Sequence, residues 1–233
     1  MTSLWDDLRE EPTRMQRWRA VLRRQPSAFL LAVQLLVILL LPWIEGPTWG
    51  RAVLIVLSLT ALTVAVLTVR STPALTWLAV GLALPAGTLE VAGVAYQGNG
   101  VLAAVAHTAL AIFYAYTAFA LISYMFEDAW VTKDELFAVG ACFTVLVFAF
   151  AYLYLGIQEV YPHSFTSVDG PGQRTFLELV YFSGANLTSV GLSDVGSIRP
   201  VARSVTTIEQ LGGVLYVAMV ISRLVALTVL RNR

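Results

Sequence analysis

The residues best suited to chemistry form a short polar stretch near the C-terminus, Leu187–Asp194, with the order Leu-Thr-Ser-Val-Gly-Leu-Ser-Asp. Apolar segments flank this stretch on both sides. The backbone carbonyls of an extended strand that contains glycine can replace the water around a monovalent cation, and nearby hydroxyls can assist them. Such a stretch is more often an ordinary polar loop, so its flanks decide whether it coordinates ions.

The composition indicates an integral membrane protein. Of 233 residues, 58% are hydrophobic and 13% are charged. Glu45 is the one charged residue between Ser27 and Arg51, and none lies between Ala52 and Val69. Such runs are too long and too uncharged for a soluble core helix, which keeps a polar face. We therefore expect a multi-pass protein of the plasma membrane.

Six apolar segments are long enough to cross a hydrocarbon core of about 30 Å. Their ranges are 27–44, 52–69, 73–95, 101–126, 135–157 and 205–230. A seventh apolar segment, 175–187, is too short to span and ends in polar residues, which favours a re-entrant half-helix. Irregular backbone at membrane depth must be buried in protein or line water. The pattern predicts an all-α membrane protein with six transmembrane helices, and a pore helix and filter between the fifth and sixth.

Three parts follow from this division. Residues 1–26 form a cytoplasmic or interfacial segment, in which 3–25 are expected to make a helix at the headgroups or between subunits. Residues 27–130 form a four-helix transmembrane domain, and residues 131–233 form the pore domain. The first 25 residues carry six arginines, which places the N-terminus, and after six spans the C-terminus, in the cytoplasm.

The fourth span does not have the pattern of a voltage sensor, which needs several arginines along one helix. Residues 101–126 contain none. His107 is the titratable group within this span, and we interpret it as an interior histidine with its hydrogen bonds satisfied rather than as a proton sensor. Gating by movement of arginines is therefore not expected.

A resemblance extends this interpretation. Tyr181-Phe182-Ser183, four further residues and then Thr188–Asp194 resemble the pore of bacterial two-helix-pore potassium channels, whose pattern is YFS, four residues, then TTVGYGD. The similarity continues into the last apolar span and covers roughly residues 135–230. The resemblance implies that the ion is coordinated at filter positions by Thr188, Ser189, Val190, Gly191, Leu192 and Ser193. It also implies that Asp194 lies behind the outer end of the filter.

Three filter positions depart from the family pattern: Ser189 replaces threonine, Leu192 replaces tyrosine and Ser193 replaces glycine. Serine at 189 keeps the inner hydroxyl. Ser193 is the serious change, because a left-handed backbone at a residue other than glycine costs about 1–2 kcal/mol. We expect weaker potassium selectivity, with Na⁺ also passing, or poor conduction.

Positions on the last span leave alternatives open. Gly212 and Gly213 are implied to form the gating hinge of the pore-lining helix, but glycine also permits close helix packing. Glu209 either hydrogen-bonds behind the filter or faces the outer mouth. Arg223 either reaches the membrane interface or pairs with Asp134 or Glu135 on the cytoplasmic linker. Cys142, the one cysteine, is expected to face lipid or pack in the core.

The main hypothesis is a cation channel. One chain supplies one filter strand, so a closed ring requires a symmetric homotetramer. The permeant ion is K⁺, with Na⁺ as a second possibility, and no cofactor, metal or nucleic acid is expected. The alternatives are a non-conducting subunit that modulates another channel, or a transporter or membrane enzyme. Transporters commonly show paired repeats, and neither His107 nor His163 belongs to a catalytic motif, so we expect no enzyme.

Overall fold

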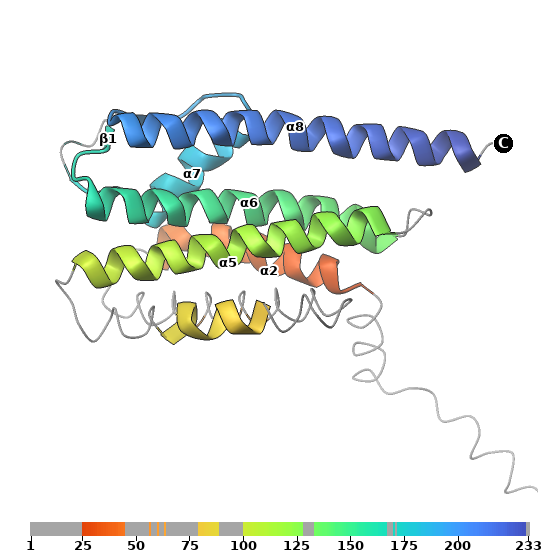
Figure 1. The fold of residues 1–233 in the computed structure, drawn as a ribbon, viewed down its shortest axis with the longest axis horizontal. Helices are drawn as coiled ribbons and strands as arrows, with labels where there is room; N and C mark the ends of the chain where they lie inside the picture. The colour runs from red at the N-terminus through yellow and green to blue at the C-terminus, as the bar shows by residue number, and fades with distance from the viewer. Residues whose placement is uncertain are drawn as a thin grey trace, which may run out of the picture.

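A computed structural model describes residues 25–44, 79–88, 100–127, 133–166 and 172–231, together with Val56, Thr60, Thr63 and Gly170. Its labelled helices are α2 (Pro26–Ile44), α5 (Gly100–Glu127), α6 (Lys133–Val160), α7 (Phe176–Leu187) and α8 (Pro200–Arg231). Two short strands, β1 (Phe165–Thr166) and β2 (Gly196–Ser197), complete the order. A further apolar helix covers Ala79–Thr88. Figure 1 shows the long helices side by side.

The long helices agree with the sequence prediction where the structure describes them. α2, α5, α6 and α8 are each long and apolar enough to cross a membrane, and they coincide with the first, fourth, fifth and sixth predicted spans. The spans 52–69 and 73–95 lie mostly outside the described residues, as does the predicted helix 3–25 apart from Gln25. α8 starts at Pro200 rather than at 205, because proline is well suited to the first turn of a helix. The protein is a mainly helical membrane protein.

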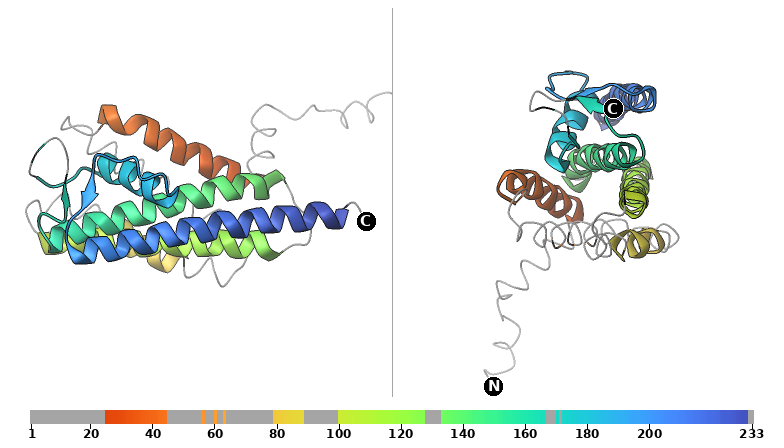
Figure 2. Two further views of the ribbon diagram at one scale, coloured as in Figure 1. Left: turned by 90° about the horizontal axis from the view of Figure 1, so that it is seen from above. Right: turned by 90° about the vertical axis from the view of Figure 1, so that its left-hand side faces the viewer.

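α6 lies at the centre of the described bundle. It packs against α5 and α2 on one side and against α7 and α8 on the other, as the view along the bundle in Figure 2 shows. Its aromatic side chains fill the core, and the Tyr114 and Tyr152 rings stack with centroids 5.5 Å apart. α8 is more peripheral: 17% of its most apolar window is buried, against 56% for α6. A large part of α8 is therefore open to lipid or to another chain.

α7 enters the bundle at one end and stops about midway along α8 (Figure 1). Thr175 caps its start, and Thr175 and Glu178 form a reciprocal capping box, which satisfies backbone N–H groups at the helix start. β1 and β2 pair antiparallel, with Phe165 opposite Ser197, so the chain returns to the end from which it entered. The predicted half-helix 175–187 is confirmed as a helix.

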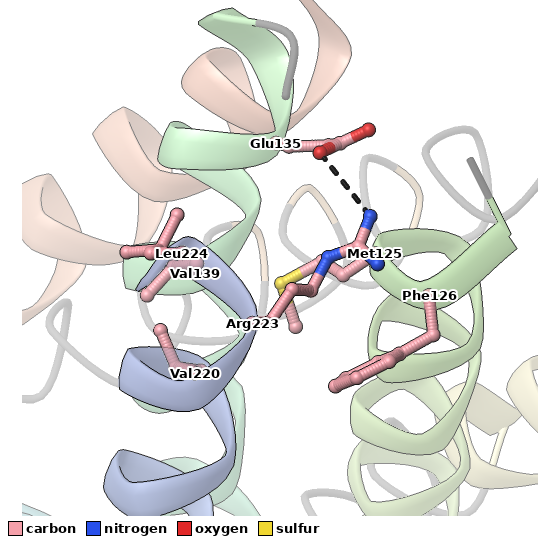
Figure 3. Close-up of a pocket in the computed structure, with 7 residues that line it drawn as sticks. All are labelled: Met125, Phe126, Glu135, Val139, Val220, Arg223 and Leu224. Atoms are coloured by element: carbon pink, nitrogen blue, oxygen red, sulfur yellow. Dashed lines mark ion pairs between the residues drawn. The ribbon is translucent and has the colours of Figure 1, made fainter. Parts of the chain in front are cut away.

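Two neighbouring carboxylates at the start of α6 connect all four long helices at the opposite end. Asp134 accepts hydrogen bonds from the amide and hydroxyl of Ser27 on α2, at 3.1 and 2.9 Å, and from the Tyr124 hydroxyl on α5 at 3.3 Å. Glu135 forms an ion pair of 3.5 Å with Arg223 of α8, whose guanidinium lies 4.9 Å from the centre of the Phe126 ring. Figure 3 shows this pair at the edge of an apolar pocket. Of the two alternatives for Arg223, the structure contains the ion pair.

Asp134→Ala should lower the thermal unfolding temperature of the detergent-solubilised protein, because hydrogen bonds to a charged group contribute about 1.5–3 kcal/mol. Tyr124→Phe removes only the longest of the three bonds and should have a smaller effect. Equal effects of the two variants, or no effect of Asp134→Ala, would show that this junction does not stabilise the bundle.

Candidate functional site

The polar stretch identified in the sequence follows α7 directly and lies on the surface of the single chain. Thr188 to Leu192 are all exposed, and the side chains of Val190 and Leu192 are 60% and 72% exposed. Asp194 is also exposed, and it makes no hydrogen bond or ion pair within the part of the chain that the structure describes. Polar and apolar groups are therefore presented together on one surface.

The backbone of this stretch turns sharply at the end of α7. The N–H groups of Thr188, Ser189 and Gly191 donate to carbonyls of the last α7 turn, at 3.1, 2.8 and 2.9 Å, which satisfies acceptors that a helix end leaves unpaired. Ser189 has φ 58° and Gly191 has φ 69°. The Gly191 carbonyl accepts a hydrogen bond from the Ser193 N–H at 3.0 Å, so in the single chain it is bonded within the stretch.

The expectation that Ser193 has a left-handed backbone is wrong. Among the described residues other than glycine, positive φ occurs at His163 and Ser189. Ser193 instead uses its side chain in a local turn, where its hydroxyl oxygen accepts a hydrogen bond from the Val195 N–H at 3.1 Å. The strain falls on Ser189, because it occupies the position after the helix cap where a left-handed residue, usually glycine, ends a helix.

Glu209 lies behind α7 and not at the outer mouth. Its side chain is fully buried, and its carboxyl group hydrogen-bonds with the Ser183 hydroxyl of α7 and, at 2.6 Å, with the Tyr154 hydroxyl of α6. One side chain of α8 therefore joins three helices. This arrangement corresponds to the first of the two alternatives, a hydrogen bond behind the polar stretch.

A count of hydrogens constrains this cluster. The Ser183 hydroxyl has one hydrogen and two oxygen neighbours, the Val147 carbonyl at 3.0 Å and a carboxyl oxygen of Glu209. Tyr154 likewise lies within reach of Glu209 and of the Thr206 hydroxyl, the latter at 3.3 Å. A hydrogen on the Glu209 side chain would satisfy the Ser183 contact while Ser183 donates to Val147. An amide at position 209 would supply such a hydrogen at all times.

Gly213 brings the backbone of α8 against the end of α7. A β-carbon at this position would lie 1.9 Å from the Leu187 carbonyl oxygen, so only glycine fits without movement. A β-carbon at Gly212 would meet nothing within 4 Å. The packing alternative accounts for Gly213, while the hinge role of either glycine stays a prediction, and α8 runs continuously through both.

Sequence reasoning missed two residues beside the polar stretch. Asn186, at the end of α7, is 5% exposed, and its side-chain amide donates to the Phe182 carbonyl at 2.8 Å. Its side-chain oxygen accepts a hydrogen bond from Gln210 of α8 at 2.8 Å. The available signal was the presence of two amides within apolar helices, but their pairing over 24 positions depends on the tertiary fold.

Two remaining expectations can be compared with the structure. The Nδ1 atom of His107 is buried and has no hydrogen-bond partner in the described ranges, so the interpretation of this histidine as fully satisfied is wrong. Its ring on α5 lies beside the ring of Tyr152 on α6, with centroids 6.4 Å apart. Cys142 is fully buried, which confirms core packing.

Comparison with known protein families gives a match over part of the chain. Residues 140–229 match the model of a family described as ion channel, and this range contains most of α6, all of α7, the polar stretch and most of α8. The match indicates an ion channel. No curated protein and no solved structure matches the chain.

Gly213→Ala should destabilise the protein by about 1–3 kcal/mol or more, because the added methyl group would overpack the contact with the Leu187 carbonyl. Gly212→Ala is the matched control, since it adds the same methyl group to the same helix in open space. Thermal unfolding in detergent measures both. A similar loss in the two variants would mean that helix propensity or flexibility, and not this contact, is responsible.

Glu209→Gln should retain most of the stability of the protein, because an amide can donate to Ser183 and accept from Tyr154. Glu209→Leu should lose about 1–3 kcal/mol, since it leaves both buried hydroxyls without this partner. The comparison uses thermal unfolding under identical conditions. If the Gln variant is as unstable as the Leu variant, a hydrogen on the side chain at position 209 does not satisfy the Ser183 contact.

Proposed function

We propose that this protein is a homotetrameric cation channel that passes K⁺ down its electrochemical gradient. The observation that carries the proposal is the ion-channel match over residues 140–229. Within that range a half-helix ends inside the bundle and is followed by an exposed stretch with Gly191 at φ 69°. A short helix followed by an exposed stretch could supply the backbone carbonyls that cation coordination requires.

The homotetramer is supported by the surfaces that the polar stretch and α8 expose in the single chain. Thr188 and Ser189 are exposed polar residues, and the long helices beside them, α6 and α8, are apolar. Polar backbone at membrane depth is stable only against protein or water. Several copies that surround one axis would supply both, with the polar stretch around the axis and the exposed side of α8 against the next copy.

Cation preference follows from two sources of negative potential. α7 directs the partial negative charge of its C-terminal end toward the polar stretch. Asp194 is exposed at the other end of that stretch, where its carboxylate would attract cations. We propose that Asp194 and the carbonyls of Thr188 to Ser193 form the ion path. Selectivity for K⁺ over Na⁺ would be reduced, because Ser193 bonds to the Gly191 carbonyl.

The remaining features of the proposal concern topology and gating. It includes six spans in the plasma membrane, with both termini in the cytoplasm. Gating would not use arginine movement, because the span at 101–126 contains no arginine. A bend at Gly212 or Gly213 would open the inner end of α8.

One observation favours a second candidate, a non-conducting subunit that modulates another channel. The Gly191 carbonyl is occupied by the Ser193 N–H at 3.0 Å, which removes one carbonyl from each copy of the proposed filter. If that bond persists in the assembly, the path would bind ions poorly.

The two candidates differ in K⁺ flux. Purified protein in liposomes with a K⁺ gradient should show dye-reported flux, and Gly191→Ala should abolish it, because a side chain at φ 69° is strained. Gly81→Ala, which meets nothing within 4 Å in the helix Ala79–Thr88, is the matched control and should conduct normally.

The assembly state is measured in parallel by size exclusion with light scattering. An intact tetramer without flux would contradict the channel and favour the modulatory subunit. A monomer or dimer that conducts would contradict the tetramer. Reversal potentials with K⁺ on one side and Na⁺ on the other would then rank the two ions.

A further inference from the structure

The distal half of α8, residues 214–231, is connected to α6 through polar contacts. The Tyr216 hydroxyl donates a hydrogen bond to the Val139 carbonyl at 2.7 Å, and the Arg223 guanidinium forms its ion pair with Glu135 at 3.5 Å. Both α6 partners lie in the first two turns of that helix. These contacts are therefore at the end of the bundle opposite to β1 and β2 (Figure 1).

The ion pair lies in mostly apolar surroundings. The side chains of Arg223 and Glu135 are 14% and 5% exposed. An apolar pocket between α5, α6 and α8 adjoins the pair (Figure 3), and its other lining residues are Met125, Phe126, Val139, Val220 and Leu224. Opposite charges attract each other more strongly when they are removed from water. The pair therefore contributes more to the position of α8 than an exposed pair would.

The proximal half of α8 is held in a different way. The α8 backbone at Gly213 adjoins the Leu187 carbonyl, and Glu209 hydrogen-bonds with hydroxyl groups of both α6 and α7. Because α7 ends at Leu187, it does not extend along the distal half. A bend at Gly212 or Gly213 would therefore move the distal half relative to α6 while the proximal half keeps its contacts with α7.

We propose that the ion pair between Arg223 and Glu135 is a releasable restraint that keeps α8 unbent, and that its release allows α8 to bend at Gly212 or Gly213. This inference rests on the proposed channel, in which that bend opens the inner end of α8. The helix is continuous from Pro200 to Arg231 while the pair is formed, so the restrained form is the closed one. The pair thereby sets the fraction of time for which the channel is open.

The first experiment measures the ratio of open to closed time of single channels in planar bilayers. Arg223→Gln and Glu135→Gln each remove one charge and should raise this ratio roughly three- to tenfold, a typical coupling between an ion pair and a conformational equilibrium. The double variant should add little, because both changes break the same contact. An unchanged or lower ratio in the single variants, or full additivity, would overturn the proposal.

An exchange of the two charges distinguishes the pair from separate roles of its members. Arg223→Glu and Glu135→Arg each place like charges together, so each should raise the ratio. The two changes combined restore opposite charges and should return the ratio toward the wild-type value. No recovery in the combined variant would mean that the charges act separately, which contradicts the restraint.

Glu159 provides the matched control. It lies on the same helix as Glu135 but at its opposite end. Glu159→Gln makes the same chemical change and should leave the ratio of open to closed time unaltered. A rise equal to that in Glu135→Gln would mean that the loss of any carboxylate from α6 favours opening, and the proposal would be wrong.

A second measurement does not depend on current. Val220 lines the pocket and is 9% exposed, so a cysteine at this position should react slowly with a maleimide in the purified protein. Adding Glu135→Gln to Val220→Cys should raise the labelling rate roughly three- to tenfold, in proportion to the released fraction. Cys142 is buried, so the chain without Val220→Cys gives the background. Equal rates with and without Glu135→Gln would overturn the proposal.

The failure of this inference differs from the failure of the channel. A wild-type protein that carries no current contradicts the proposed channel, while the labelling rates still test the restraint. If the wild-type protein conducts and the neutral variants gate as it does, this inference alone fails. Should a charge variant not assemble, Tyr216→Phe removes the bond to the Val139 carbonyl and should raise both the open ratio and the labelling rate. No rise in either would overturn the proposal.

Discussion

The backbone contact between Gly213 and Leu187 is the constraint on which the candidate site depends. It is a contact without side chains on the α8 side, so it sets the distance between α7 and α8 at its minimum. At that distance, the neighbouring α8 residues Glu209 and Gln210 can each reach a polar side chain of α7. A larger residue at 213 would separate the helices and break both hydrogen bonds. We call this contact and the two hydrogen bonds beside it the α7–α8 seam. The seam positions the start of the polar stretch, since Thr188 directly follows Leu187.

The seam also explains why polar residues lie inside an apolar bundle. A buried polar group is stable only when its hydrogen bonds are made, and Glu209 meets this condition through hydroxyls from two other helices. The three-helix cluster fixes α7 from behind, while the Asn186–Gln210 pair fixes it from the side. α7 is thus held at its end, where the chain leaves the helix, and not only at its capped start.

Much of the fold could be predicted from the sequence, because hydrophobic length determines membrane helices and polar residues mark where α7 ends. The conformation of the polar stretch could not. The left-handed residue is Ser189 and not Ser193, since the hydrogen bonds of the helix end, and not similarity to a filter pattern, select it. The direction of Glu209 and the partner of Gln210 also required the tertiary fold, because each depends on residues more than 20 positions away.

The β1–β2 pair holds together the two ends of the segment that lies between these strands and contains α7. Phe165 and Ser197 lie opposite each other. The two ends of the segment that contains α7 and the polar stretch are therefore adjacent, at one end of the bundle. A segment whose ends meet can be exchanged between related chains without changing how α6 and α8 approach each other. The recipient would need the matching glycine and two polar neighbours on α8, and also the α6 residues that contact α7, such as Val147. Replacement of this segment could therefore change the exposed surface that follows α7 while the surrounding helices stay the same.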